Sequence, residues 1–269
     1  MIFAMSDIHG HYTEFMQAIH NLDDLSTVKE GRDKLILLGD YIDNGPESYK
    51  VVKKIYDLQR ECGKEQVIAV RGNHEKWFLD FLYTKERDWL GEDWNLNTSR
   101  TFLMEEQLEK VKELALKEGG DAAYNFIREL IRNNHKELIE WMYQLPYYYA
   151  TETQVFVHAG VDEEAGEFWQ LGTSNYFFVE KFPPSYGTFC KDIIAGHVST
   201  SSFVKEHNFH DVVWDGQSHY YIDGSVRSGR RIPILVYDEN EKRYYSLEGN
   251  LREGKMKEVK VADRYANSI

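Results

Sequence analysis

The stretch that decides the fold is residues 35–45, Leu-Ile-Leu-Leu-Gly-Asp-Tyr-Ile-Asp-Asn-Gly. Its apolar run at 35–38 ends directly at a glycine and an aspartate, which is typical of a buried parallel strand that closes in a polar turn. The apolar runs 2–5 and 67–70 end at polar residues in the same way. Apolar residues at helical spacing separate the three runs, so we predict βαβ units and a parallel sheet.

The rest of the chain divides into two further parts. From about residue 77 to 145 it is rich in charge and carries apolar residues at helical spacing, which predicts a helical insertion beside the core rather than an independent domain. After Pro146, β-type runs return between turn-forming residues. We expect one domain over residues 1–250 and a charged C-terminal tail over residues 251–269.

Composition excludes several classes of protein. The 269 residues include 45 Asp and Glu against 32 Lys and Arg, for a formal net charge of −13. Such a surface repels nucleic-acid phosphates, so a duplex-binding face is not expected. No apolar run reaches the roughly 18 residues of a membrane span. Two cysteines and a start without a signal-peptide pattern favour the cytoplasm, and the sequence carries no signal for an oligomeric state.

Side chains with metal-binding chemistry follow the predicted strands. In chain order these strand ends carry Asp7 and His9, Asp40 and Asp43, Asn73 and His74, His158, and His197. Because the carboxyl ends of parallel strands open onto the ligand crevice of an α/β sheet, we expect these side chains to lie together. Carboxylate, imidazole and amide oxygen donors suit manganese, iron, zinc or magnesium better than a soft metal.

Each of these fragments has a simpler interpretation when it is taken alone. An Asp-x-His is more often a turn residue with a surface histidine, and an asparagine at a helix start is usually a cap. Five such fragments in order, each at a strand end, are very hard to explain separately. Histidines that match no motif, such as His11 and His219, are expected to be surface or satisfied interior residues.

The ordered series resembles the motifs of the calcineurin-like metallophosphoesterases, and more closely their phosphoprotein phosphatase branch. The motifs that carry the resemblance are Ser6-Asp7-Ile8-His9-Gly10, Gly39-Asp40-Tyr41-Ile42-Asp43-Asn44-Gly45, Arg71-Gly72-Asn73-His74-Glu75, His158-Ala159-Gly160, Gly196-His197 and Tyr221-Ile222-Asp223-Gly224. They extend from about residue 2 to 237, and the segment 80–145 carries none of them. The resemblance implies an α/β fold, a two-sheet α/β/β/α sandwich with a helical cap insertion at about 77–145.

The resemblance also implies roles for the motif residues. The metal ligands would be Asp7 and His9 for a first divalent ion, Asn73, His158 and His197 for a second, and Asp40 bridging both. His74 would be the general acid, oriented by Asp43. Two such ions, with manganese expected first, would neutralise phosphate charge and lower the pKa of a water between them. An imidazolium favoured by a carboxylate partner can protonate the departing oxygen.

One part of the family pattern is missing. The family's Asp-Arg-Gly is Asp43-Asn44-Gly45 here, and residues 159–196 contain no arginine where the family has a second one. Those arginines normally grip the substrate phosphate, and bidentate arginine contacts are strong. Asn44 can donate a hydrogen bond to a phosphate oxygen but carries no charge. We name Asn44 and Arg71 as candidate phosphate contacts.

These observations predict a dinuclear-metal-dependent phosphoesterase that hydrolyses phosphate monoesters, similar to bacterial serine/threonine phosphatases. Its partner would be a phosphorylated substrate, namely a phosphoprotein, a nucleotide or a small phosphate ester. One alternative is a bis(5'-nucleosyl)-tetraphosphatase-like hydrolase of dinucleoside polyphosphates, which shares the motifs and cleaves a phosphoanhydride. A second alternative, a metal- or phosphate-binding protein without turnover, is motivated by the missing arginines, but the retained pair Asp43 and His74 argues against it.

Overall fold

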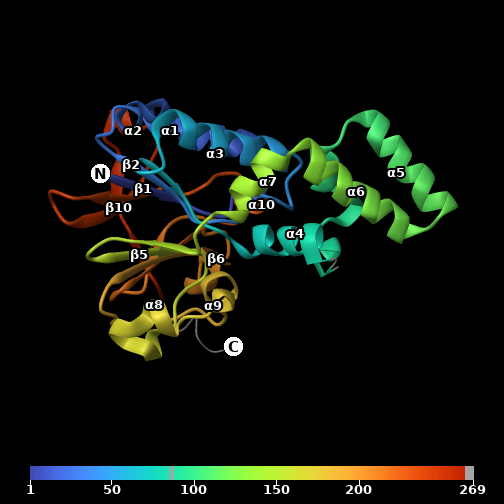
Figure 1. Cartoon of the computed structure of the whole chain (residues 1–269). Helices are drawn as coiled ribbons and strands as arrows, with labels where there is room; N and C mark the ends of the chain where they lie inside the picture. Colours follow the sequence, from blue (N-terminus) through green and yellow to red (C-terminus); the bar gives the residue numbers. More distant parts are fainter. Residues whose placement is uncertain (85, 87, 264–269) are drawn as a thin grey trace.

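The computed structural model, which describes all residues except 85, 87 and 264–269, is a sandwich of two sheets between layers of helices (Figure 1). In spatial order the first sheet contains β11 (Met256–Glu258), β10 (Arg243–Leu247), β9 (Leu235–Asp238), β1 (Ile2–Met5), β2 (Lys34–Leu37) and β3 (Val67–Ala69). The second contains β12 (Lys260–Val261), β7 (Val213–Trp214), β8 (His219–Asp223), β6 (Asp192–Ser199), β5 (Gln154–Val157) and β4 (Tyr148–Ala150). This is the predicted two-sheet α/β architecture.

Helices cover the outer face of each sheet (Figure 1). The first sheet is covered by α1 (Tyr12–Asn21), α2 (Ser26–Lys29) and α3 (Ser48–Cys62), and the second lies beside α8 (Trp169–Gly172) and α9 (Asn175–Glu180). A short helix, α10 (Val226–Gly229), follows β8. Single 3-10 turns lie at Asp23–Leu25, Asp88–Gly91, Trp94–Leu96, Ser99–Phe102, Glu163–Phe168, Thr200–Phe203 and Leu251–Glu253.

Strand β1 explains why the apolar runs of the sequence are continuous. Phe3 and Met5 point into the core beneath the helices, whereas Ile2 and Ala4 point into the layer between the two sheets, where they pack with residues such as Ile194. Both faces of the strand are therefore buried, and each face needs apolar side chains. The predicted parallel order is confirmed, because β2 pairs in parallel with both β1 and β3.

The C-terminal segment differs from the tail that the sequence suggests. Strand β11 pairs with β10 in the first sheet, and β12 pairs with β7 in the second. Residues 251–263 therefore contribute an edge strand to each sheet, and 264–269 lie outside the described residues. The charged composition misleads here because edge strands are exposed on one side and often carry charge.

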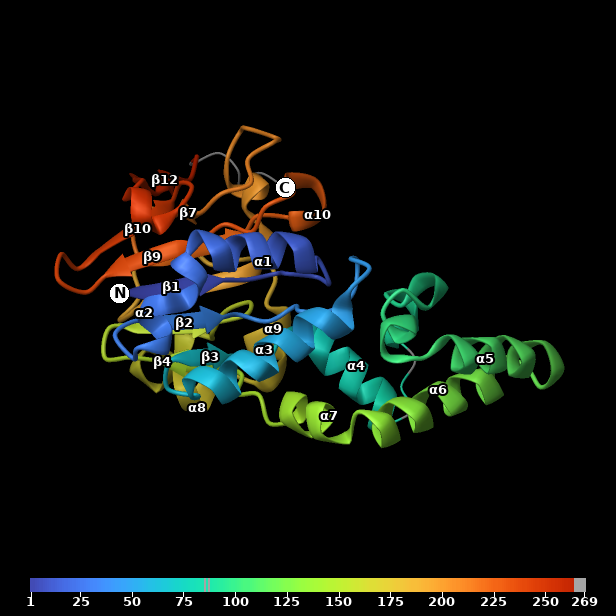
Figure 2. The ribbon, with the colours of Figure 1, turned by 90° about the horizontal axis from the view of Figure 1, so that it is seen from above.

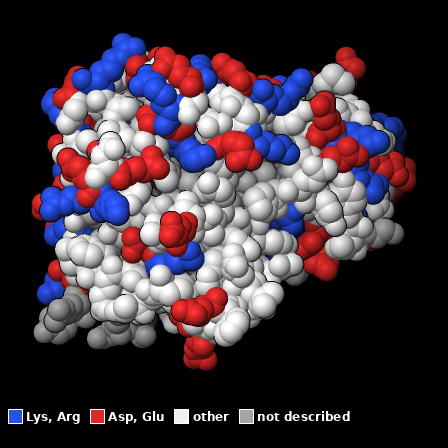
Figure 3. All heavy atoms as spheres, turned by 60° about the vertical axis from the view of Figure 1, so that its left-hand side comes forward, with Lys and Arg blue, Asp and Glu red and all other residues white. Residues whose placement is uncertain are grey.

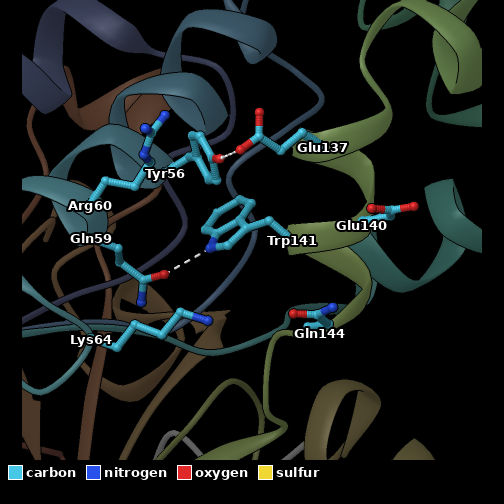
Figure 4. Close-up of a pocket in the computed structure, with 8 residues that line it drawn as sticks. All are labelled: Tyr56, Gln59, Arg60, Lys64, Glu137, Glu140, Trp141 and Gln144. Atoms are coloured by element: carbon cyan, nitrogen blue, oxygen red, sulfur yellow. Dashed lines mark hydrogen bonds between the residues drawn. The ribbon is translucent and has the colours of Figure 1, made fainter.

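The helical insertion projects from one end of the sandwich (Figure 2). It contains α4 (Asn73–Thr84), α5 (Glu105–Lys117), α6 (Gly120–Asn134) and α7 (Lys136–Tyr143), with α5 and α6 side by side at its far end. Helix α7 returns against α3, where Trp141 Nε1 donates to Gln59 Oε1 at 2.7 Å. A cavity of about 330 Å³ lies between these two helices (Figure 4), and none of the predicted site residues lines it.

Acidic and basic side chains are interspersed on the face that Figure 3 displays, so they form no patch of a single sign there. Within the described part of the chain, no helix is both long enough and apolar enough to cross a bilayer.

Candidate active site

The motif residues of the two sheets converge on the carboxylate of Asp40. Its Oδ2 lies 3.4 Å from His158 Nε2, 3.6 Å from His9 Nε2 and 3.7 Å from His74 Nε2. His158 Nε2 also lies 2.8 Å from the side-chain amide of Asn73. These residues follow β1, β2, β3 and β5, so strand ends that are far apart in the sequence meet in one place, as expected.

Two groups of potential metal-ligating side chains share this carboxylate. One is His9, Asp40 and His74, and the other is Asp40, His158 and His197, with ligand atoms within 4.8 Å of one another in each group. Asp7 Oδ1 lies 3.8 Å from His9 Nε2, beside the first group. A carboxylate common to two groups is the arrangement that a bridging ligand between two metal ions requires.

Backbone carbonyls orient two of the imidazoles. His9 Nδ1 lies 3.0 Å from the carbonyl of Ile42, and His158 Nδ1 lies 2.8 Å from the carbonyl of Leu38. Because a carbonyl oxygen only accepts, these contacts assign the ring proton to Nδ1 in each neutral imidazole. The Nε2 lone pairs, which face Asp40, are then left for a metal ion.

The backbone is left-handed at many of the site residues. The φ angles are 53° at Asp7, 46° at His9, 55° at Asp40, 69° at Asp43, 61° at Asn44 and 65° at His197. Each such residue costs on the order of 1–3 kcal/mol, and such strain tends to concentrate at functional sites. The strain is held by close packing, since a Cβ on Gly72 would lie 2.2 Å from Asp40 Oδ1.

His197 lies within a strand and not directly after one, contrary to the expected position at a strand end. Strand β6 continues to Ser199, and its register with β8 breaks between Ala195 and Ser199. In this irregular stretch the His197 N–H donates to Asp7 Oδ2 at 3.1 Å. Gly196 permits the approach, because a Cβ there would lie 2.2 Å from the same oxygen. Such an irregularity changes the direction in which a side chain, here that of His197, points from the strand.

Glu75 is a functional residue to which the sequence assigned no role. Its buried carboxylate accepts hydrogen bonds from the backbone N–H groups of Asp40 and Tyr41, each at 2.8 Å, and of Gly72 at 3.0 Å. It therefore holds the loop that presents Asp40. Burial, and then the charge of Asp40, raises the pKa of Glu75 to about 7. Its place in the motif Arg71–Glu75 was the only signal in the sequence.

Buried carboxyl groups with raised pKa values lie around Asp40. Burial raises the pKa of Asp7 to about 6, and burial together with the charge of Asp7 raises the pKa of Asp223 to about 7. Burial, reinforced by His158, lowers the pKa of His197 to about 4, so that imidazole is neutral at pH 7. The neutral imidazole of His197 and the buried carboxylates beside it form a donor set that fits divalent cations, whose charge would offset this field.

His74 and Asp43 form a short buried pair. His74 Nδ1 lies 2.6 Å from Asp43 Oδ2. Burial alone would lower the pKa of His74, but Asp40 and Asp43 raise it to about 10, so the imidazolium is favoured. The helical insertion completes the environment of Asp43, to which Trp89 and Thr98 donate hydrogen bonds. Neither residue belongs to a motif, so the sequence offered no signal for them.

The two candidate phosphate contacts differ in their surroundings. Asn44 is exposed, and its Nδ2 lies 3.2 Å from His9 Nδ1 at the edge of the site. Arg71 is buried, and its guanidinium donates to the carbonyl of Tyr143 and, at 3.2 Å, to the hydroxyl of Tyr147. Its two terminal nitrogens are therefore engaged by Tyr143 at the end of α7 and by Tyr147, which follows the insertion.

Two of the histidines outside the motifs, His11 and His219, are buried in the interior. His219 is buried, and its Nδ1 lies 3.0 Å from Asp215 Oδ2. His11 is also buried, with Nδ1 3.7 Å from Glu14 Oε2, and it belongs to neither group of potential ligands.

Comparison with known proteins agrees with this geometry. A model of the family described as calcineurin-like phosphoesterase matches residues 1–221. The chain is 37% identical over 83 residues to a symmetrical bis(5'-nucleosyl)-tetraphosphatase of Wigglesworthia glossinidia brevipalpis, which covers 31% of this chain and 27% of that protein. It is 35% identical over 103 residues to serine/threonine-protein phosphatase 2 of Escherichia coli K12, which covers 36% of this chain and 42% of that protein. The chain thus matches less than half the length of either relative.

The fold also has a counterpart among solved structures. The crystal structure of a mutant of a cold-active protein tyrosine phosphatase matches with a TM-score of 0.54 and 17% sequence identity. The match covers 91% of this chain and 76% of that chain. At this identity the likeness concerns the fold alone.

Proposed function

The chain belongs to the calcineurin-like phosphoesterase family, and on that premise we propose that it is a dinuclear-metal-dependent phosphoesterase that hydrolyses phosphate monoesters. The observation that carries the proposal is the carboxylate of Asp40, shared by two groups of ligand atoms, with the pair His74 and Asp43 beside it. A two-metal site and a positioned proton donor are the two elements that ester hydrolysis uses.

We assign the metal ligands as the sequence suggests. One ion would be held by Asp7, His9 and Asp40, and the other by Asp40, Asn73, His158 and His197. The buried carboxylate and imidazole donors, and the Nε2 atoms of His9 and His158 that face Asp40, support this assignment. When bound, two divalent ions would neutralise phosphate charge and lower the pKa of a water between them. Manganese is our first choice, with iron, zinc and magnesium as alternatives.

His74 is proposed as the general acid. Its Nδ1 is occupied by Asp43, so Nε2 is the atom that would give a proton to the departing oxygen. The Asp40 and Asp43 carboxylates keep the ring charged, and Asp43 would fix its orientation. Asn44 would donate a hydrogen bond to a phosphate oxygen in place of the family arginine, and the engaged guanidinium of Arg71 makes it the weaker candidate.

A dinucleoside polyphosphate hydrolase is the second candidate, and the similarity to the tetraphosphatase supports it. The two functions place different demands on the proton donor. A phosphate leaving group departs readily without protonation, whereas the alkoxide of a serine or threonine ester is a poor leaving group that needs a proton. The buried pair His74 and Asp43 therefore favours monoesters.

A comparison of three substrates tests the proposal. Purified protein with manganese is assayed against p-nitrophenyl phosphate, a phosphoserine peptide and diadenosine tetraphosphate. We expect hydrolysis of both monoesters with a higher kcat/KM than for the anhydride. Fast anhydride cleavage with negligible monoesterase activity would replace the monoesterase by the second candidate. Two bound metal ions with no hydrolysis of any substrate would favour a binding protein.

We also propose a cytoplasmic location. The thiols of Cys62 and Cys190 are both free, as expected in a reducing compartment. Measuring the thiol oxidation state in protein rapidly trapped from cells would test this, and a disulfide there would contradict it.

A further inference from the structure

Two side chains of the helical insertion donate hydrogen bonds to the carboxylate of Asp43, the partner of the proposed general acid His74. Trp89 Nε1 donates to Asp43 Oδ2 at 2.9 Å, and Thr98 Oγ1 donates to Asp43 Oδ1 at 2.5 Å. Both lie far along the chain from Asp43, and all three side chains are buried. With His74 on Oδ2, each carboxylate oxygen has at least one donor, so the carboxylate has one preferred orientation.

The two donors are themselves firmly held. Asp93 accepts hydrogen bonds from the backbone N–H groups of Thr98 at 2.7 Å and of Ser99 at 3.0 Å, and is almost fully buried. Asn97 Nδ2 donates to the carbonyl of Gly45 at 3.0 Å, next to the turn that carries Asp43. The Trp89 ring packs in the aromatic core of the insertion, 4.8 Å from the ring of Phe78. The segment 89–99 is therefore held in place at several points, which include Trp89, Asn97 and Thr98.

We propose that Trp89 and Thr98 are positioning residues of the proton donor, so that the helical insertion is part of the catalytic apparatus. This inference rests on the proposed function, because it gives His74 its role as the general acid. The physical basis is that His74 Nδ1 can donate along a fixed line only if the accepting carboxylate does not rotate. If Thr98 loses its hydroxyl, Oδ1 becomes a buried acceptor without that partner, and the carboxylate gains freedom to turn away from His74.

Three substitutions test the role of the two donors. Thr98→Val removes the hydroxyl and keeps the shape, Thr98→Ser keeps the hydroxyl, and Trp89→Phe removes the indole N–H. For Thr98→Val and Trp89→Phe we expect kcat/KM on a phosphoserine peptide to fall roughly 10- to 100-fold, below the roughly 10²–10⁴-fold of a whole general acid. The value for p-nitrophenyl phosphate should fall less than about threefold, because nitrophenolate needs little protonation. Thr98→Ser should restore turnover.

Trp141→Phe is the matched control for Trp89→Phe. Trp141 also lies in the insertion, is buried and donates its indole N–H to a side-chain oxygen, but that oxygen belongs to Gln59 and has no contact with Asp43. Its activity ratio between the two substrates should equal that of the unmodified protein. An equal loss on both substrates in Thr98→Val and Trp89→Phe, with correct folding, would overturn the inference and leave these residues as ordinary packing.

A spectroscopic readout separates this inference from the proposed function. The His74 ring proton in its short bond to Asp43 should give a low-field ¹H NMR signal, identified by its loss in His74→Asn. We expect this signal to shift or broaden in Thr98→Val and Trp89→Phe and to stay unchanged in Trp141→Phe. Unchanged signals in all three variants would overturn the inference even if the protein is an active phosphoesterase. Shifted signals in a protein that hydrolyses no ester would support the positioning and contradict the proposed function.

Discussion

The edge of the two sheets and the helical insertion contribute to the same site in different ways. The sheet edge supplies every proposed metal ligand, at strand ends, in the irregular stretch of β6 that carries His197, or at a helix start that directly follows a strand. The insertion supplies no proposed ligand beyond that helix start, but it donates two hydrogen bonds to Asp43 and so reaches the proposed proton donor. On the proposed roles, metal binding would depend on the sandwich, and proton transfer would depend on both regions.

The difference has a physical origin. Ligands at the ends of parallel strands are placed by backbone hydrogen bonds that also form the sheets, so their geometry follows from the fold. Trp89 and Thr98 are placed by contacts within the insertion, namely the packing of the Trp89 ring against Phe78 and the hydrogen bond from the Thr98 backbone N–H to Asp93. Substitutions in the two regions should therefore have separable effects on metal content, on leaving-group dependence and on stability.

The largest effect is expected at Asp40, which belongs to the sheet edge. Asp40→Asn replaces a carboxylate oxygen shared by both ligand groups with an amide, so it should reduce turnover by more than about a hundredfold and lower the metal content. Metal content is measured by elemental analysis and turnover with p-nitrophenyl phosphate. Asp57→Asn, a surface residue of α3 paired with Lys53, is the control. A variant that keeps two metals and normal turnover would show that Asp40 does not bridge.

The second effect separates proton donation from metal binding. His74→Asn should slow hydrolysis of a phosphoserine peptide by roughly 10²–10⁴-fold and that of p-nitrophenyl phosphate much less, with metal content nearly unchanged. Asp43→Asn should show the same pattern more weakly, because it removes only the orienting partner. If His74→Asn loses metal, His74 is a ligand of the group that contains His9 and Asp40 rather than the acid.

The third effect concerns the support of the metal site. Glu75→Gln leaves an amide NH₂ facing backbone N–H donors, so we expect a loss of about 1–3 kcal/mol in the free energy of unfolding. Metal affinity should weaken roughly 10- to 100-fold because the loop that carries Asp40 loosens. Urea unfolding in the presence of a chelator and metal titration measure the two quantities. Glu61→Gln, an exposed residue of α3, should change neither, and unchanged affinity in Glu75→Gln would contradict the supporting role.

The smallest effect on catalysis is expected within the insertion, away from Asp43. Trp141→Phe removes one buried hydrogen bond to Gln59, so the free energy of unfolding should fall by about 1–2 kcal/mol. Turnover of both esters should stay within about twofold of the unmodified protein, because the indole N–H of Trp141 is bonded to Gln59 and not to Asp43. Thermal or urea unfolding and steady-state assays provide the measurement. A selective loss on the phosphoserine peptide would mean that the whole insertion, and not only segment 89–99, controls proton transfer.

Parts of the site could be predicted because they depend on local sequence. An apolar run buried on both faces of a sheet must end where the chain reaches the edge, and a polar residue with glycine beside it marks that edge, as at Gly39 and Asp40. Once several runs are parallel, their ends meet at one edge. The convergence of His9 and Asp40 therefore follows from the parallel strands of the first sheet, whereas the position of His158 beside them also depends on how the second sheet packs against the first.

Other parts were decided only by the tertiary structure, because they depend on contacts between segments that have no fixed spacing. The sequence does not indicate that Trp89 and Thr98 would reach Asp43, nor that the guanidinium of Arg71 would be taken up by the carbonyl of Tyr143. It also does not indicate that charged residues 256–261 would add an edge strand to each sheet. Motifs and hydrophobic periodicity reflect the local backbone structure. A side-chain hydrogen bond between distant segments produces no periodic pattern in the sequence.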